Sequence, residues 1–268
     1  MMKKDASLVL LVVSLILTVF ISVAAAGPVL DRIVKEGKLV VGLTGQQPPM
    51  NATTKQGELI GLDVDLAKAM ASAMGVELAF ETMAFADLLP ALVSGKVDIV
   101  VSGMTTTAAR NKQVAFVGPY FVSGKGLLAQ AERYATLKSG EGLNAPSVTV
   151  AALKYSTSLE FAENLMPKAQ LIPTDSYDEA IELILAGKVD VLVADYPFCA
   201  LTAFRYQDKG LAAGQSPLTY EPLGIALQED TLLINWMQNF LVTLEGRGEM
   251  KKMHQKWMKG GSWVNDLP

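Results

Sequence analysis

Short apolar runs alternate with amphipathic stretches along most of the chain. Residues 38–43 form an apolar run that stops at a Gly/Pro-rich segment, which predicts a buried strand followed by a loop. Between Leu62 and Met74 the apolar positions recur at helical spacing, with acidic residues in the first turn and Gly75 after the last one. Strands that alternate with helices in this way indicate βαβ units and a mostly parallel sheet.

The same alternation begins again after residue 125. Predicted strands cover residues 38–43, 76–80, 97–101, 148–153, 169–172, 189–194 and 224–227. Predicted helices cover residues 62–74, 86–94, 158–165, 177–186, 231–245 and 248–258. The chain therefore has the length and the pattern of two α/β units followed by a C-terminal tail.

One segment occurs twice. GKVDIVVSG at residues 95–103 and GKVDVLVAD at residues 187–195 align without gaps, and each follows an amphipathic helix. Coincidence is the alternative, because a helix followed by Gly-Lys and a strand is a common turn. The shared position in two α/β runs favours two similar lobes. The tail after residue 224 has no place in the second lobe, which suggests that it returns to the first and that the chain crosses between the lobes twice.

The N-terminus has the three parts of a secretory signal peptide. Lys3 and Lys4 supply positive charge, residues 8–23 are strongly apolar, and residues 24–26 are the small residues of a cleavage site before Gly27. The alternative is an uncleaved membrane anchor, because the uncharged run at 6–26 is long enough to span a bilayer. No cysteine follows this run, so a lipoprotein anchor is not predicted. We expect a mature periplasmic chain that begins at Gly27.

Composition narrows the classes of protein. Half of the residues are apolar (50%) and 19% are charged, which excludes a disordered chain. The mean hydropathy is +0.30, but the long uncharged run is confined to the N-terminus, so a multi-span membrane protein is excluded. The net charge of −4 and the absence of a basic stripe in the sequence argue against a nucleic-acid partner. Cys199 and His254 are single residues of their kind, so we predict no Cys/His metal site and no cofactor.

Polar residues cluster at the ends of the two repeated strands. Ligands of open α/β sheets bind beyond the carboxyl ends of the strands, and these strands end in Ser102-Gly103 and in Asp195. The loop after the first strand carries Thr105 and Arg110, whose planar guanidinium suits a carboxylate. If the lobes face each other, Arg110 and Asp195 lie across one cleft. Together they suit the carboxylate and the ammonium of a zwitterion.

A third element extends this candidate site. Ser156, Thr157 and Ser158 open a predicted helix, whose free N–H groups and dipole would assist the same carboxylate. Both charged candidates also have ordinary structural interpretations. A lone arginine after a strand is usually a surface residue, and Asp195 could instead cap the helix that follows it.

Five stretches of the sequence carry a resemblance to a known family. They are GLDVDLA at 61–67, GMTTTAAR at 103–110, VAFVGPY at 114–120, VDVLVAD at 189–195 and GRGEMKKMHQKW at 246–257. In this order and spacing they resemble the family 3 extracellular solute-binding proteins, the periplasmic amino-acid receptors of ABC importers. The resemblance spans residues 30–258 and implies the periplasmic-binding-protein fold, an α/β fold with two lobes, two hinge strands and a ligand cleft between the lobes.

The resemblance also implies where the domains begin and end. After the signal peptide at 1–26, residues 27–119 and 224–268 would form lobe one, residues 123–220 lobe two, and residues 120–122 and 221–223 the hinges.

Carried over position by position, the resemblance implies roles at the site. Arg110 would pair with the ligand α-carboxylate, helped by Thr105 and the backbone of Thr157. Asp195 would take the α-ammonium together with the backbone carbonyl of Ser102 or Gly103.

Three further positions concern the ligand side chain. Phe85 matches an aromatic residue that packs on it. Gln47 stands where the family usually has an aromatic residue, and Tyr155, preceded by Lys154, stands where it usually has glycine. Lys154 or Tyr155 would then reach the cleft, and these departures favour a polar amino acid.

The sequence thus predicts a monomeric binding protein, not an enzyme, that captures an amino acid and delivers it to an ABC transporter permease in the inner membrane. One alternative is a periplasmic dehydratase of the cyclohexadienyl type on the same fold, which needs a positioned general acid. Another is a ligand-sensing partner of a receptor. We also expect Cys199 to be a buried thiol in an apolar helix at 197–204 and His254 to be exposed.

Overall fold

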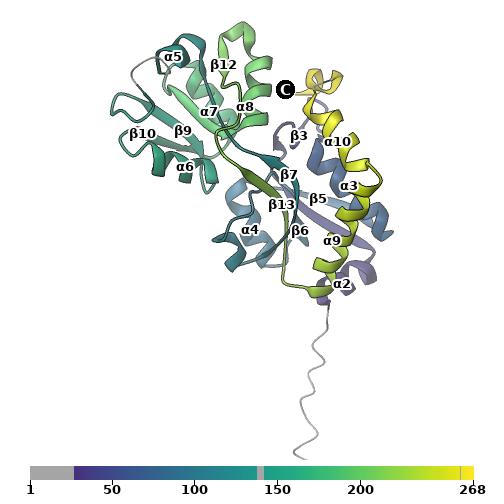
Figure 1. Ribbon diagram of the computed structural model, residues 1–268. Coiled ribbons are helices and arrows are strands. Elements are labelled where there is room, and N and C mark those ends of the chain that lie inside the picture. Colours follow the sequence, from purple (N-terminus) through teal and green to yellow (C-terminus); the bar gives the residue numbers. More distant parts are fainter. Residues whose placement is uncertain (1–26, 138–141, 260) are drawn as a thin grey trace, which may run out of the picture.

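The computed structural model describes residues 27–137, 142–259 and 261–268, so the predicted signal segment at 1–26 lies outside the described residues. The chain forms two lobes, each built on a five-stranded sheet flanked by helices (Figure 1). The strand orders are β5-β1-β6-β13-β7 in the first lobe and β10-β9-β11-β8-β12 in the second. The predicted two-lobe α/β fold is confirmed.

The first lobe contains both ends of the described chain. Its large sheet consists of β1 (Lys38–Leu43), β5 (Glu77–Thr82), β6 (Ile99–Val100), β7 (Ala115–Ser123) and β13 (Glu221–Leu227). A small sheet of β2 (Gln46–Gln47), β3 (Asn51–Thr53) and β4 (Leu59–Ile60) lies beside it. The helices are α2 (Pro28–Glu36), α3 (Leu62–Met74), α4 (Phe85–Val93), α9 (Thr231–Gly246) and α10 (Glu249–Met258), with the 3-10 helices η1 (Arg110–Lys112) and η4 (Ser262–Asp266).

The second lobe is a continuous stretch of the chain. Its strands are β8 (Lys125–Gln130), β9 (Thr149–Leu153), β10 (Gln170–Thr174), β11 (Val191–Asp195) and β12 (Leu211–Ala213). Its helices are α5 (Ala131–Thr136), α6 (Thr157–Leu165), α7 (Tyr177–Leu185) and α8 (Tyr196–Arg205), with the 3-10 helix η3 (Gln207–Lys209).

The repeated sequence motif occupies the same place in both lobes. Its strands, β6 and β11, are third in their sheets. The motif's aspartate accepts a hydrogen bond from the backbone N–H of the neighbouring strand, Asp98 from Val40 at 2.8 Å and Asp190 from Thr149 at 2.7 Å. Each carboxylate also pairs with an arginine. The shared Gly-Lys-Val-Asp therefore has a structural role, because it fixes the start of the central strand and leaves the opposite end free to face a ligand.

Two antiparallel strands connect the lobes. β7 and β13 pair from Ala115 opposite Leu227 to Ser123 opposite Glu221, and both continue from the first sheet into the second lobe. Gly124 lies where the two crossings touch, since a Cβ atom built on it would stand 2.2 Å from the carbonyl oxygen of Thr219. Only glycine therefore fits at residue 124 while the backbones of the two crossings stay this close.

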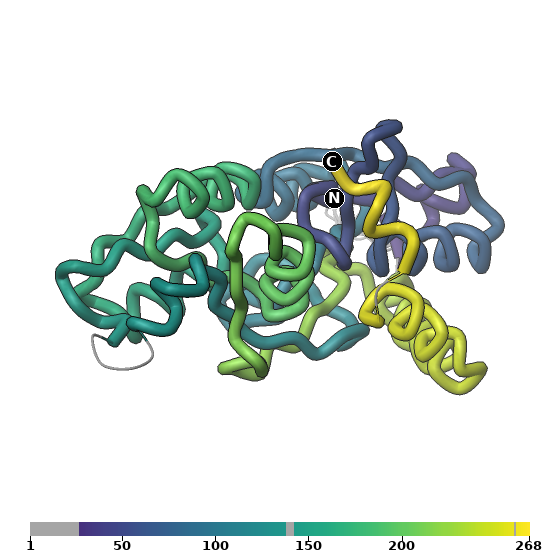
Figure 2. Tube along the Cα trace, turned by 90° about the horizontal axis from the view of Figure 1, so that it is seen from above, coloured from purple at the N-terminus to yellow at the C-terminus, as the bar shows by residue number. Residues whose placement is uncertain are grey.

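The C-terminal helices pack on the first lobe. α9 contacts β7 and α2, and α10 contacts α3, placing this tail beside the N-terminal part of the chain (Figure 2). Trp257 of α10 is buried and donates a hydrogen bond from Nε1 to Asp65 at 2.8 Å. Within the described residues, no helix is both long and apolar enough to cross a membrane.

The predictions for the single cysteine and the single histidine of the sequence have different outcomes. Cys199 in α8 is fully buried, as predicted, and burial raises the pKa of its thiol. The prediction that His254 is exposed is wrong. Its ring is partly buried, with Nε2 3.0 Å from the carbonyl oxygen of Tyr120 and an edge-on contact with Phe121. The lysines around it in sequence are exposed on the same helix, so the local charge did not indicate that the ring is packed.

Candidate ligand site between the lobes

Residues from both lobes enclose one small cavity, which we call the interlobe cavity. Eight of the predicted site residues line it, namely Gln47, Phe85, Gly103, Thr105, Arg110, Ser156, Thr157 and Asp195. Lys125, Ser158 and Tyr177 complete the lining. Its volume of about 10 Å³ is roughly what one water molecule needs, so the lobes are closed on each other here.

Arg110 bridges the two lobes. It opens η1, and its Nη1 donates to the carbonyl oxygen of Thr105 at 2.7 Å, while Nη2 donates to that of Tyr155 in the second lobe at 3.2 Å. The guanidinium carbon stands 5.5 Å from the centre of the Phe85 ring, within cation–π range. Burial lowers the pKa of Arg110, and nearby carboxylates oppose that shift. Arg110, which was predicted to pair with the ligand carboxylate, therefore lies at the cavity and not on the open surface.

Asp195 ends β11 and directly precedes α8. Its Oδ1 accepts a hydrogen bond from Lys125 Nζ at 2.9 Å, and its Oδ2 accepts one from Gln47 Nε2 of the opposite lobe at 3.0 Å. These bonds, rather than helix capping, engage the side chain. Of the two interpretations open from the sequence, the structure has the carboxylate in the cleft.

Threonine hydroxyls form a second link across the cavity. Thr105 Oγ1 of the first lobe and Thr157 Oγ1 of the second are 3.3 Å apart. Thr157 is the first residue of α6, and Ser156 caps this helix by accepting from Leu159 N at 3.3 Å. The N-terminal turn of α6 therefore faces the cavity, as its sequence predicted, and offers N–H groups and a positive dipole end to an anion.

Gly103 and Ser102 lie at the end of β6 with different roles. Gly103 has φ +55°, and a Cβ atom there would come within 2.8 Å of Gln47 Oε1, so only glycine leaves room for Gln47. Ser102 is buried beside the cavity, and its Oγ accepts a hydrogen bond from Thr44 N at 3.1 Å. Its side chain thus supports the first lobe instead of facing a ligand.

A buried network holds the floor of the cavity. Tyr120 on the hinge strand donates from its hydroxyl to Asp63 Oδ1 at 2.7 Å and accepts from Gly103 N at 3.2 Å. Asn51 Nδ2 donates to the other oxygen of Asp63 at 2.7 Å. Burial raises the pKa of Asp63 to about 6, although these hydrogen bonds lower it in part. The network ties the small sheet, α3 and the hinge strand to the backbone that borders the site.

The sequence comparisons fit this geometry. The profile of the bacterial extracellular solute-binding proteins, family 3, matches residues 39–260 of the chain. The chain belongs to this family.

Two relatives and one solved structure illustrate the range of the family around this solute-binding protein. It is 27% identical over 227 residues to ABC transporter arginine-binding protein 1 of Escherichia coli K12, covering 82% of this chain and 90% of that protein. It is 25% identical over 230 residues to cyclohexadienyl dehydratase of Pseudomonas aeruginosa, covering 86% of each. An ancestral amino-acid-binding protein, a precursor of cyclohexadienyl dehydratase, matches with a TM-score of 0.79 and 36% identity, covering 85% of this chain and 99% of that one. The two-lobe structure of the solute-binding protein is the periplasmic-binding-protein fold.

Three lining residues of the solute-binding protein were not among the predicted ligand contacts, although Ser158 belongs to the predicted helix start. Ser158 and Tyr177 lie in the first turns of α6 and α7. Lys125 is the most informative of the three, because it is only 1% exposed and pairs with Asp195. The sequence carried no local signal for it, because Lys125 stands between two glycines and its acidic partners are distant in sequence.

Lys154 and Tyr155 do not belong to the lining of the interlobe cavity, in contrast to the expectation for the solute-binding protein. The Lys154 ammonium pairs with Asp175 at 2.7 Å on the surface, and the Tyr155 side chain is 74% exposed. Only the Tyr155 carbonyl reaches the site, where it holds Arg110. Tyr155 has φ +58°, a conformation that favours glycine and accounts for glycine being usual at this position.

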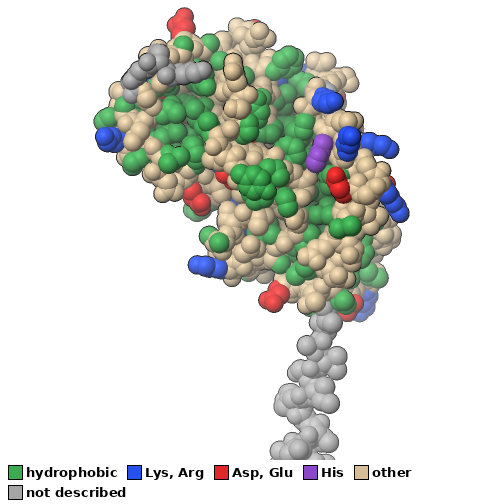
Figure 3. Space-filling model, viewed as in Figure 1, with side chains coloured by type: hydrophobic (Ala, Val, Ile, Leu, Met, Phe, Trp, Pro, Cys, Tyr) green, Lys and Arg blue, Asp and Glu red, His purple; other side chains and the backbone are tan. Residues whose placement is uncertain are grey.

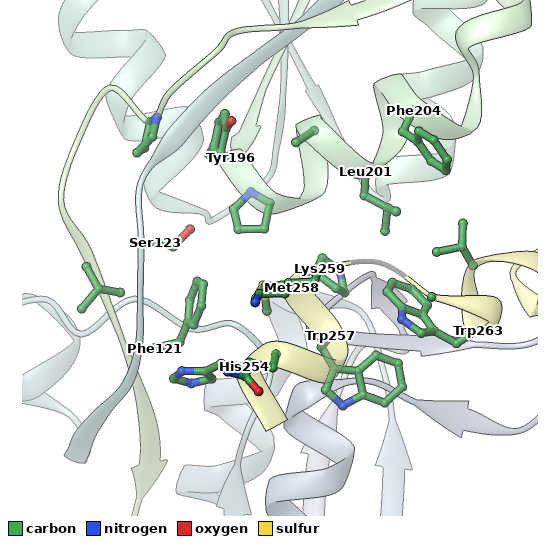
Figure 4. A pocket seen from close by; sticks show the side chains of 18 of the residues that line it. Phe121, Ser123, Tyr196, Leu201, Phe204, His254, Trp257, Met258, Lys259 and Trp263 are labelled. Atoms are coloured by element: carbon green, nitrogen blue, oxygen red, sulfur yellow. The ribbon is translucent and has the colours of Figure 1, made fainter. Parts of the chain in front are cut away.

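A larger hollow lies beside the hinge strands of the solute-binding protein, and residues 121–124 line it. This back groove, with a volume of about 960 Å³, separates α8 of the second lobe from α10 and η4 of the first (Figure 4). Leu201 and Phe204 face Met258 and Trp263 across it. Apolar side chains gather around this hollow on the molecular surface (Figure 3). The described residues that line it include lysines but no acid to receive an ammonium, so its size does not make it the better candidate.

Proposed function

We propose that the protein is a periplasmic binding protein that captures an amino acid between its lobes and delivers it to an ABC transporter permease. One observation carries this proposal. Arg110 and Asp195, a planar cation and a carboxylate from different lobes, line the same closed cavity. A zwitterion that joins them would hold the two lobes together. Relatives whose names describe arginine binding and amino-acid binding support the same ligand class.

The proposed contacts follow from the donors and acceptors at the cavity. Arg110 binds the α-carboxylate, with Thr105 and the backbone N–H of Thr157 at the start of α6 as further donors. Asp195 binds the α-ammonium, together with the backbone carbonyl of Gly103 or Ser102. Gln47 and Phe85 border the ligand side chain, and Gln47 favours a polar one.

Binding requires the lobes to separate, because the closed cavity has no room for an amino acid. We place the hinges at residues 120–122 and 221–223, between lobe one (27–119 and 224–268) and lobe two (123–220). Rotation about these strands opens the cleft, and the ligand then replaces contacts that now join the lobes directly. The closed, loaded form presents surfaces of both lobes to the permease.

Isothermal titration calorimetry of the chain from Gly27 onwards tests the proposal. The titrants are the twenty amino acids, added to protein that has been unfolded and refolded to remove any bound ligand. Saturable binding of at least one of them with 1:1 stoichiometry is expected. No heat and no thermal stabilisation with any of them would overturn the proposal.

A dehydratase is the second candidate, supported by the cyclohexadienyl dehydratase relative. Its chemistry needs a carboxylic acid or other proton donor at the substrate. Asp195 and Glu221 are the acids at Lys125, and both already accept hydrogen bonds from donors of the chain. We therefore propose binding without catalysis. Turnover of prephenate or arogenate by the purified protein would instead establish the enzyme.

A further inference from the structure

A buried ion cluster lies where the proposed ligand's ammonium would bind. Lys125 Nζ is 2.9 Å from Asp195 Oδ1 and 3.5 Å from Glu221 Oε2. The exposed fractions of the three side chains are 2%, 7% and 12%. The cluster joins the head of β8, the end of β11 and the hinge strand β13, so it sits at the junction of the two lobes.

Each acid of the cluster has other donors as well. Asp195 Oδ2 accepts from Gln47 Nε2. Glu221 Oε1 accepts from Thr219 Oγ1 at 3.1 Å, and its Oε2 accepts from Thr157 Oγ1 at 3.3 Å. Lys125 is therefore held between two carboxylates that remain in place without it.

The charges balance in a way that restricts the ligand. Among the described residues at the site, the cations are Arg110 and Lys125, and the buried anions are Asp195 and Glu221. Glu160, which also acts on Arg110, is exposed to water and does not enter the balance. An α-amino acid adds one carboxylate and one ammonium. Three pairs then form, provided that Lys125 moves from Asp195 to Glu221.

Lys125 thus occupies the ammonium site when no ligand is present. It spares Asp195 the cost of being buried without a counter-charge. When the α-ammonium arrives at Asp195, the Lys125 ammonium has Glu221 already within 3.5 Å. A short displacement of one flexible side chain is sufficient to exchange the partners.

We propose that Lys125 makes this site selective for α-amino acids with uncharged side chains, and that it excludes arginine and lysine by occupying Glu221. A cationic side chain of the ligand would find Asp195 paired with the α-ammonium and Glu221 paired with Lys125. No ion pair would then offset the cost of removing that cation from water. An anionic side chain that drew Lys125 to itself would leave Glu221 buried without a counter-charge. The inference rests on the proposed function, since it assumes an amino acid bound between Arg110 and Asp195.

The test is calorimetry with wild type, Lys125→Gln and Lys154→Gln, titrated with glutamine, serine, phenylalanine, arginine, lysine and glutamate. Wild type should bind at least one uncharged amino acid tenfold or more tightly than arginine and lysine. Lys125→Gln should reduce this preference at least tenfold, because Glu221 becomes free for a cationic side chain. Lys154→Gln removes the same charge outside the cavity and should leave the preference unchanged.

A second variant keeps the test decisive if Lys125→Gln does not fold, as judged by circular dichroism. In Glu221→Gln, Lys125 has no second acid to move to. Binding of uncharged amino acids should weaken at least tenfold, and glutamate should gain relative to them. Tightest binding of arginine or lysine by wild type, or an unchanged preference in both variants, would overturn the inference while leaving amino-acid binding intact. Absence of binding to any amino acid would instead remove the proposed function.

Discussion

Arg110 and Asp195 were singled out from the sequence because each follows a strand that the chain repeats. The structure places both at one cavity, and it shows what holds them there: Thr105 and Tyr155 carbonyls for the arginine, Gln47 and Lys125 for the acid. The strand periodicity could predict which end of each strand faces the cleft. It could not predict Lys125, because the buried partner of an acid is chosen by tertiary packing and not by local pattern.

Substituting Arg110 tests the carboxylate contact. We expect Arg110→Ala to weaken amino-acid binding by about 2–5 kcal/mol, the usual loss when one partner of a buried charge pair is removed. The measurement is calorimetric titration with the tightest ligand of the wild type. Lys112→Ala, an exposed cation of the same η1 helix, is the matched control and should bind as the wild type does. A loss of less than tenfold for Arg110→Ala would place the guanidinium outside the site.

Asp63 gives the protein a specific dependence of stability on pH. Its folded pKa of about 6 lies above the ordinary value of 3.8 for an aspartate, so the folded state binds this proton more tightly than the unfolded state does. The stabilisation is complete below about pH 4 and is lost as the pH rises through 6. A difference of this size corresponds to about 2–3 kcal/mol.

Urea denaturation between pH 4 and pH 7 measures this effect. The free energy of unfolding of wild type relative to Asp63→Asn should fall across that interval by the amount given above. Asp87→Asn, at an exposed position of α4, should run parallel to wild type. A constant difference between wild type and Asp63→Asn would show that the two states bind the proton equally.

At the scale of elements, most strands and helices with a clear period were predicted, whereas the strands β7 and β8 were not. The helices α3, α6, α7, α9 and α10 lie within a few residues of their predicted bounds. β8 was missed, although residues 125–129 are all buried, because a run that starts Lys-Gly lacks the features of a strand. The strand pairs with β11 and β12, both more than sixty residues later, and such partners leave no local signal.

The crossing of the hinge strands depends on Gly124. We expect Gly124→Ala to destabilise the protein by about 1–3 kcal/mol, because its methyl group would overlap the Thr219 carbonyl and force the crossings apart. Gly246→Ala is the control. Gly246 ends α9 with nothing near its Cβ position, so alanine there should be neutral or stabilising. Equal stability of the two variants in urea denaturation would contradict the close approach at the crossing.

At the scale of the whole molecule, the interlobe cavity and the back groove are both lined by residues of the two lobes. The cavity is nearly shut while the groove is wide. We expect hinge bending that opens the cavity to narrow the groove. The apolar faces of α8 and of α10 with η4 then approach each other as the ligand cleft opens, and the Arg205 hydrogen bond to the Pro268 carbonyl near this side changes with them.

A bulky side chain in the back groove should therefore resist opening. We expect Ala200→Trp, on the α8 wall, to slow ligand release and to tighten binding several-fold. Stopped-flow fluorescence measures the rate of ligand release, and calorimetry measures the dissociation constant. Val34→Trp, at an exposed position of α2, adds the same side chain away from the groove and the hinge strands and should leave both unchanged. Equal effects of the two variants on release and affinity would show that filling the groove does not hinder opening of the cleft.

The closed cleft also joins its own polar groups to one another. Gln47 donates a hydrogen bond to Asp195, and the hydroxyl groups of Thr105 and Thr157 are 3.3 Å apart. A ligand that enters the cleft must replace these bonds, so contacts within the protein compete with ligand binding. The observed dissociation constant then equals the intrinsic one divided by the fraction of molecules that stand open. Substitutions that change how readily the cleft opens, and that lie away from the ligand, can thus shift the concentration range over which the receptor works without altering which ligand is preferred.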